Sequence, residues 1–268
     1  MKSTTVRLAL AQIHIAPGER ARNLQRATEF IEKAARRNAR LVILPEALPF
    51  GWMDPSALGQ ADHIPGGETC QTLSRAAEAA GLYVCSGVIE RHGDKLFNAA
   101  VLIRPTGEVI LHHRKINELK IAHDLYALGD RIRVADTELG RIGLMICADA
   151  FVPGQAISRS LALMGAQLIV SPCAWAVPPD FDSSVTPYGQ LWIDNYGPVC
   201  REFGVWIAGC SNVGPIQSGP WAGYKCIGAS MVVGPDGRVR AHGPFGEDSE
   251  DLIFIDVDVP TRIRPVCC

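Results

Sequence analysis

The chain has 268 residues, of which 47% are hydrophobic and 20% are charged, and its formal net charge is −2 at pH 7. This composition is typical of a soluble globular protein and excludes the disordered, fibrous and membrane classes. The nearly balanced charge gives no bulk attraction to nucleic acid.

Strands and helices alternate along the first part of the chain. Branched apolar residues alternate over Val6–Ile15 and predict a strand, since Gln12 and His14 interrupt the apolar run before it reaches the length of a secretory signal. Leu41–Leu44 predicts a short buried strand that Pro45 ends. The remaining expected elements are helices over Asn23–Arg37 and Glu68–Ala80 and strands over Tyr83–Glu90, Lys95–Ile103 and Val109–His113.

The second part of the chain repeats this order. We expect strands over Arg141–Ile146, Gln167–Val170, Val205–Cys210, Ser230–Val233, Val239–His242 and Leu252–Asp256, and helices over Gln155–Met164 and Leu191–Phe203. No linker separates the two parts, so we predict one domain over residues 1–268 with an α/β fold in which helices cover mixed sheets. No stretch reaches the roughly 18 apolar residues of a membrane-spanning helix, and we expect a cytoplasmic protein.

The nine cysteines form an odd set without Cys-x-x-Cys spacing or a neighbouring His pattern, which argues against a zinc site and a disulfide framework. Most lie in apolar segments, where cysteine behaves as a small buried hydrophobe. Cys267 and Cys268 end a polar tail, and we expect them to be exposed thiols.

Three polar residues follow apolar strands directly or nearly so: Glu46, Lys115 and Cys147. Chemistry in α/β sheets gathers outside the carboxyl ends of strands. A thiolate can attack a carbonyl carbon, a cation can favour the thiolate and stabilise the oxyanion, and a carboxylate can carry the proton. Position alone leaves other interpretations open: Glu46 as a solvated strand cap or a member of an ion pair, Lys115 as part of a solvated basic edge, and Cys147 as a buried structural thiol.

Short motifs around these residues resemble the three signatures of the nitrilase, or carbon-nitrogen hydrolase, superfamily. The segments are Leu44-Pro45-Glu46, His113-Arg114-Lys115-Ile116 and Gly143-Leu-Met-Ile-Cys147-Ala-Asp149. Further family-like positions include Asn98, Trp175 and Asn212. The resemblance implies a four-layer αββα sandwich, a homodimer or higher homo-oligomer, and no metal or organic cofactor.

The resemblance also implies a role for each residue. Glu46 becomes the general base, Lys115 the oxyanion stabiliser and Cys147 the nucleophile, and the backbone N–H of Ala148 assists the lysine. Many members carry a second glutamate beyond the lysine that orients the triad. Glu118 lies closer to Lys115 than that pattern has it, so a supporting role stands against an ion pair with Arg114 or Lys120.

The sequence departs from the family pattern after the cysteine. Members that act on N-carbamoyl amino acids or dicarboxylic monoamides have an Arg four residues beyond it, where this chain has Phe151. A phenyl ring cannot replace that bidentate donor. Trp175 is predicted either as a wall for the substrate or as a core residue, and Asp149 either as a structural acceptor of backbone N–H groups or as a substrate contact.

These observations predict hydrolysis of a small linear amide through a thioester. Nitrile hydrolysis is a rival, although true nitrilases usually show Cys-Trp-Glu where this chain has Cys147-Ala148-Asp149. N-carbamoyl amide hydrolysis is a second rival, and a catalytically silent binding protein on the same fold is an alternative of another class. A papain-like enzyme would need an activating His, and no such signature accompanies the cysteine.

Overall fold

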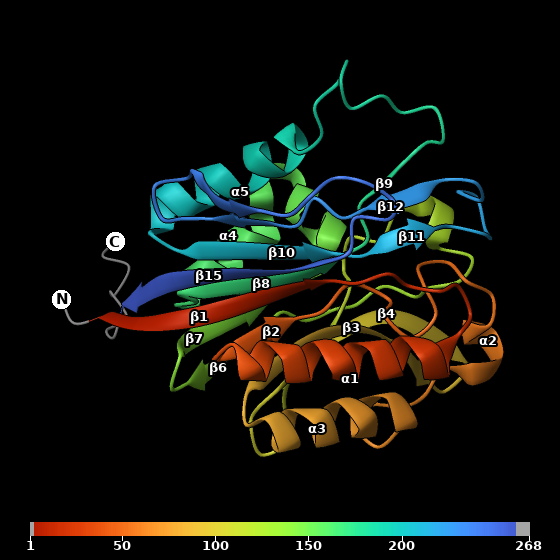
Figure 1. Cartoon of the computed structure of the whole chain (residues 1–268), viewed down its shortest axis with the longest axis horizontal. Coiled ribbons are helices and arrows are strands. Elements are labelled where there is room, and N and C mark those ends of the chain that lie inside the picture. The colour runs from red at the N-terminus through yellow and green to blue at the C-terminus, as the bar shows by residue number, and fades with distance from the viewer. Residues whose placement is uncertain (1–2, 261–268) are drawn as a thin grey trace.

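Two six-stranded sheets lie face to face between two pairs of helices in the computed structural model, which describes residues 3–260 (Figure 1). Helices α1 (Arg20–Arg36) and α3 (Glu68–Ala80) cover one sheet, and α4 (Ala156–Leu163) and α5 (Gln190–Phe203) cover the other. The predicted four-layer αββα sandwich with mixed sheets is confirmed.

The first sheet has the order β15-β1-β2-β3-β4-β5. Its central pairs β1–β2 and β2–β3 are parallel, and the outer pairs are antiparallel. In chain order its strands are β1 (Ser3–Gln12), β2 (Leu41–Ile43), β3 (Tyr83–His92), β4 (Lys95–Ile103), β5 (Val109–Arg114) and β15 (Asp251–Pro260), and a short helix α2 (Ala57–Gln60) lies between β2 and α3.

The second sheet has the order β14-β13-β10-β8-β7-β6. Its strands are β6 (Val134–Thr137), β7 (Gly140–Leu144), β8 (Leu168–Cys173), β10 (Trp206–Ser211), β13 (Met231–Val233) and β14 (Val239–His242). A separate three-stranded sheet contains β9 (Ala176–Val177), β11 (Val213–Pro215) and β12 (Lys225–Ile227), and the 3₁₀ helices are η1 (Lys120–Ala122), η2 (Cys147–Phe151) and η3 (Pro153–Gln155).

Alternating side chains of the central strands are buried on both faces. On β1, Val6, Leu8 and Leu10 enter the core shared with the second sheet, whereas Ala9 and Ala11 enter the core beneath α1 and α3. Because successive side chains of a strand point to opposite faces, one apolar run serves two cores. This packing fixes the sheets against each other, and with them the strand ends that carry the polar residues.

Several predicted boundaries were wrong. The strand expected over Val6–Ile15 ends at Gln12, and the one expected over Arg141–Ile146 ends at Leu144, because the next two residues turn toward Cys147. Strand β15 is longer than expected, since it pairs with β1 along the whole of that strand. The three-stranded sheet and β6 were missed, since their two to four residues show no clear period.

The seven cysteines between residues 3 and 260 are buried and form no disulfide. Cys267 and Cys268 lie outside the described residues. Among the described residues, none of the helices combines the length and the apolar character required to cross a membrane.

Glycine at position 87 allows the segment that carries Glu46 to lie directly on β3. A Cβ atom there would lie 2.4 Å from the Cα of Glu46 and 2.5 Å from the carbonyl oxygen of Pro45. We expect Gly87→Ala to lower the free energy of unfolding by about 1 to 3 kcal/mol, because backbone atoms must move to admit the methyl group. Urea unfolding followed by circular dichroism measures the change.

Gly59→Ala is the matched control, because a Cβ atom at that position would have no other atom within 4 Å, and Gly59 is in α2. Alanine favours a helix, so this variant should be as stable as the wild type or slightly more so. Equal free energies of unfolding for the two variants would show that the structure accommodates a Cβ atom at position 87 without cost.

Candidate active site

Glu46 lies beside the carboxyl ends of strands from both sheets. It follows β2 and is 2% exposed. Its N–H donates to the carbonyl oxygen of Cys173 at the end of β8, at 3.1 Å. This hydrogen bond joins the first sheet to the second at the site.

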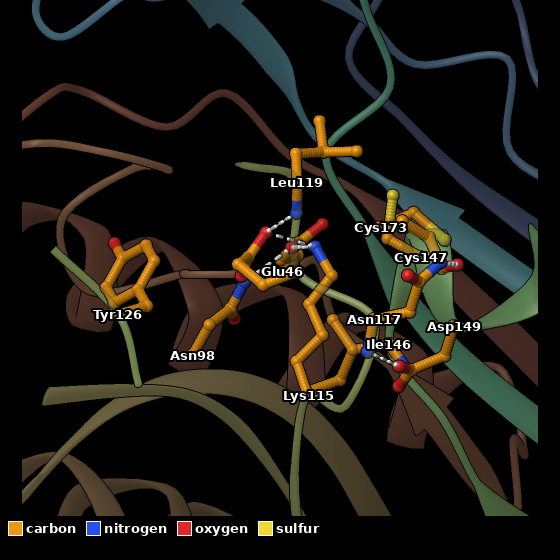
Figure 2. Close-up of polar contacts among 12 residues, drawn as sticks. Glu46, Asn98, Lys115, Asn117, Leu119, Tyr126, Ile146, Cys147, Asp149 and Cys173 are labelled. Carbon is orange, nitrogen blue, oxygen red and sulfur yellow. Dashed lines mark hydrogen bonds and ion pairs between the residues drawn. The ribbon is translucent and has the colours of Figure 1, made fainter. Parts of the chain in front are cut away.

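Lys115 directly follows β5 and is also 2% exposed. Its main-chain N–H donates to the carbonyl oxygen of Asn98 at 2.8 Å, which continues the β4–β5 pairing by one residue. The side chain extends from this strand end to Glu46, as Figure 2 shows.

Cys147 opens η2 in a left-handed backbone conformation, with φ of 43°. This conformation is strained for a residue with a Cβ and persists where neighbours hold it. The N–H of Cys147 donates to Ser171 Oγ at 3.0 Å, and the residue is 9% exposed. Its thiol lies close enough to Glu46 and Lys115 for their charges to act on its pKa, and Cys173 is its neighbour in Figure 2.

Four buried side chains form a closed hydrogen-bonded cluster. Lys115 Nζ donates to Glu46 Oε1 at 2.7 Å and to Glu118 Oε1 at 3.0 Å. Asn98 Nδ2 donates to Glu46 Oε1 at 2.7 Å and to Glu118 Oε2 at 2.8 Å. The Glu118 carboxylate also accepts the N–H of Leu119 at 3.0 Å. The structure therefore brings Glu46, Lys115 and Glu118 together beside Cys147.

The charges of this cluster determine its protonation. Burial lowers the pKa of Lys115, but the charges of Glu46 and Glu118 outweigh it and raise that pKa well above its ordinary value. Burial raises the pKa of Glu46, and Lys115 only partly offsets this effect. Burial also raises the pKa of the Cys147 thiol, with Cys173 and Glu46 adding to the effect and Lys115 opposing it. At neutral pH the site therefore contains an ammonium group and an un-ionised thiol.

Asp149 connects the cysteine segment to the lysine segment. Its carboxylate accepts the N–H groups of Ile116 and Asn117 at 3.0 and 2.8 Å and that of Ile146 at 2.9 Å. It also contacts His113 Nε2 at 2.7 Å. Burial raises the pKa of Asp149, but His113 and the backbone donors outweigh it, and the net shift is downward. A single carboxylate thus holds the residues that flank Lys115 and Cys147.

Comparison with known proteins identifies the family. The family model described as carbon-nitrogen hydrolase matches residues 7–264. The chain belongs to the carbon-nitrogen hydrolase family. It is 30% identical to a nitrilase of Pyrococcus abyssi, over 94% of this chain and 90% of that protein. It is 29% identical to omega-amidase NIT2 of Bos taurus, over 95% of this chain and 89% of that protein.

Solved structures show the same fold. An amidase from Nesterenkonia sp. superposes with a TM-score of 0.80 at 22% sequence identity, over 96% of this chain and 92% of that one. In a structure of a mutant of the amidase from Nesterenkonia sp. AN1, the acetamide moiety of fluoroacetamide is added covalently at the active-site cysteine.

Of the two alternatives for Glu118, the ion pair with Arg114 or Lys120 is absent within residues 3–260. Arg114 binds Glu90 through two hydrogen bonds of 2.7 Å, on the opposite side of β5 from Lys115. Glu118 lies instead within the cluster of this carbon-nitrogen hydrolase, 6% exposed. Its shorter spacing from the lysine does not prevent this contact.

An aromatic stack begins at the cysteine turn. The ring of Phe151 lies 4.5 Å from that of Trp192, and Trp192 stacks on Trp175 at 4.3 Å. Trp175 is 1% exposed, and its Nε1 has no hydrogen-bond partner among the residues described. Trp175 packs in the core at the buried end of this stack.

Sequence reasoning assigned no role to Asn98 or His113, although Asn98 is a member of the cluster and His113 contacts Asp149. His113 shares one face of β5 with Leu111, and both are buried. This period-two pattern was a signal that His113 points inward with Lys115. Asn117 was missed entirely; its Nδ2 donates to the carbonyl oxygen of Ala148 at 2.6 Å. The N–H of Ala148 donates no hydrogen bond within residues 3–260.

We expect Asp149→Asn to lower the free energy of unfolding by about 3 kcal/mol, because an amide cannot accept all of these buried donors. The wild type has this stabilisation above the ordinary pKa of aspartate and loses it as the pH falls through the depressed folded-state pKa. Urea unfolding at pH 7 and at acid pH measures both effects.

Asp136→Asn serves as the control, since Asp136 makes an exposed ion pair with Arg141 and should contribute little. Equal unfolding midpoints for the two variants would contradict the connecting role of Asp149.

Proposed function

We propose that this carbon-nitrogen hydrolase cleaves a small linear amide through a thioester on Cys147 and releases ammonia or an amine. The observation that carries the proposal is the buried ammonium group of Lys115, hydrogen-bonded to Glu46 and acting on the Cys147 thiol. A thiol, a fixed positive charge and a proton acceptor are the groups that acyl transfer requires.

The first half-reaction forms the thioester. Glu46 takes the proton of the Cys147 thiol while the sulfur attacks the carbonyl carbon, and the carbonyl oxygen becomes an oxyanion. Protonated Glu46 then gives its proton to the nitrogen as the C–N bond breaks. The raised pKa of Glu46 makes it a stronger base than an exposed glutamate, which favours the first transfer.

The second half-reaction releases the acid. Glu46 removes a proton from a water molecule, and the hydroxide oxygen attacks the thioester carbon. The C–S bond breaks, and the sulfur recovers its proton from Glu46. The site thus returns to its starting protonation state.

Lys115 and the backbone N–H of Ala148 supply the oxyanion donors in this proposal. The raised pKa of Lys115 keeps its charge through the cycle, and the Ala148 N–H donates to no group within the described residues. A single donor of this kind changes kcat by roughly 10² to 10³. Glu118 supports Lys115 by accepting a second hydrogen bond from its Nζ, at 3.0 Å.

The cysteine turn favours a substrate whose acyl group is uncharged. Phe151 packs on Trp192 at the position where members that bind carboxylates have an Arg, and Trp175 supports Trp192 from the buried side. An aromatic surface on the same short helix as Cys147 suits an apolar group and gives a carboxylate no counter-charge. We therefore place N-carbamoyl amino acids and dicarboxylic monoamides below neutral amides.

Nitrile hydrolysis is the second candidate, favoured by the Pyrococcus abyssi relative. The same thiol can attack a nitrile carbon. Ammonia release from butyramide, hexanamide, benzamide, propionitrile, benzonitrile, succinamate and N-carbamoylalanine distinguishes the candidates. We expect the neutral amides to give the highest kcat/KM, whereas higher values for the nitriles would favour the rival.

Cys147→Ala should abolish turnover and leave the fold intact, because the nucleophile is lost and only a small buried group is removed. Cys70→Ala is the matched control, since Cys70 is a buried thiol on α3 and should be dispensable for activity. Circular dichroism and the ammonia assay test both variants. Residual turnover near the wild-type rate in Cys147→Ala would remove the proposed nucleophile, and inactivity of all substrates in the wild type would favour a silent binding protein.

Phe151→Arg should raise the ratio of kcat/KM for succinamate to that for butyramide by about tenfold, because a guanidinium group pairs with the substrate carboxylate. Phe151→Leu is the control that removes the ring without adding charge. A ratio that changes equally in both variants would show that position 151 does not face the acyl group.

A further inference from the structure

Asn98 contacts every charged member of the cluster. It lies on β4, is 1% exposed, and pairs with Ile89 of β3. Its side-chain NH₂ group donates to Glu46 and Glu118, and its main-chain carbonyl oxygen accepts the main-chain N–H of Lys115. One residue thus fixes both carboxylates and the backbone of the lysine.

The two donors to Glu46 converge on a single oxygen. Lys115 Nζ and Asn98 Nδ2 both lie 2.7 Å from Glu46 Oε1. Within residues 3–260, Oε2 of Glu46 accepts no hydrogen bond from the protein. Its lone pairs are therefore available, and Oε2 is the oxygen of this carboxylate that can receive a proton without displacing a donor.

The orientation of the Asn98 amide is fixed by its surroundings. If the amide were rotated by half a turn, its oxygen would face two carboxylates, and acceptors do not bind acceptors. In the observed orientation Oδ1 has no partner among the residues described. An unsatisfied buried acceptor is unfavourable, and the two charge-assisted bonds of the NH₂ group outweigh it.

We propose that Asn98 is a positioning residue that holds Glu46 by Oε1 and leaves Oε2 as the atom that exchanges protons with Cys147, the leaving group and water. The inference rests on the proposed function, because it assigns the proton transfers of that reaction to one oxygen. Without Asn98 the carboxylate can rotate about its last bond, and either oxygen can face Lys115.

A pH effect accompanies this geometry. The strongest influences on the pKa of Glu46 are burial, Lys115, Glu118 and Asn98. The side chains of Cys147, Tyr126 and Cys226 also lie close enough for the charge of Glu46 to raise their pKa values. The Asn98 hydrogen bond lowers the pKa of Glu46 and so opposes the effects of burial and of Glu118. Its removal should raise that pKa further, and the acid limb of the kcat/KM profile should move to higher pH.

The test compares Asn98→Ala and Asn98→Asp with the wild type, using the neutral amide of highest kcat/KM among butyramide, hexanamide and benzamide. Asn98→Asp keeps the shape of the side chain and replaces the donor with a third carboxyl group, which separates loss of the hydrogen bond from loss of packing. We expect kcat to fall about 10²-fold in both variants with KM within about threefold, since misplacement of a catalytic group acts on the chemical step. The acid limb should shift to higher pH, more so in Asn98→Asp.

Asn23→Ala is the matched control. Asn23 is a fully buried asparagine that makes three hydrogen bonds to the backbone of Ala16 and Pro49, none of which involves the cluster. This variant should lose stability while keeping the wild-type pH profile. A purely structural role of Asn98 predicts the same outcome for Asn98→Ala, which would overturn the proposal.

Alkylation of Cys147 by iodoacetamide at pH values from about 5 to about 9, measured by mass spectrometry, gives a readout that needs no substrate. The rate should depend on the same acid limb, because the thiol must pass its proton to Glu46. An unshifted limb in Asn98→Asp would refute the positioning role even if Cys147→Ala is inactive. Activity retained in Cys147→Ala would instead refute the proposed function, so the two failures are distinct.

Discussion

The buried ammonium group of Lys115 is the constraint on which the rest of the site depends. An ion taken out of water loses several kcal/mol of solvation even after the protein relaxes, and Lys115 is 2% exposed. Glu46 and Glu118 offset this loss at 2.7 and 3.0 Å. Two carboxylates at such a spacing repel each other, and Asn98 binds both. Because each member offsets an unfavourable effect of another, the cluster is stable only as a whole.

Because Lys115 must stay within hydrogen-bonding distance of its partners, its position relative to Cys147 must also be fixed, and Asp149 fixes it. Lys115 follows a strand of the first sheet and Cys147 a strand of the second, so packing of the two sheets sets their distance only coarsely. Hydrogen bonds of 2.8 to 3.0 Å from Ile116, Asn117 and Ile146 to one carboxylate set it more narrowly. The positions of the Lys115 and Cys147 side chains therefore depend on backbone N–H groups that take no part in the proposed reaction.

Sequence reasoning located the chemistry at the strand ends because period and breakers mark where a buried strand stops. Glu46, Lys115 and Cys147 were found in this way, and the family resemblance gave them roles. Asn98 and His113 were quoted only as parts of motifs, because their partners lie 52 and 36 residues away and no local pattern encodes such contacts. The spacing of Glu118 from Lys115 did not show whether the glutamate joins the site, because that depends on the path of the loop after β5.

Cys147 was correctly placed after β7, but its left-handed backbone conformation depends on Ser171 and Asp149, which lie outside that strand.

An un-ionised thiol at rest follows from the charge already present. A thiolate would place a negative charge in a region of low dielectric beside the carboxyl group of Glu46, and burial and Glu46 both raise the pKa of the thiol. In the proposed reaction the proton moves from Cys147 to Glu46, so a carboxylate disappears as the thiolate forms and the net charge is unchanged. The same transfer produces the acid that the leaving nitrogen needs. Since one carboxylate both creates the nucleophile and supplies that acid, the site requires no histidine beside the cysteine, and His113 remains bound to Asp149.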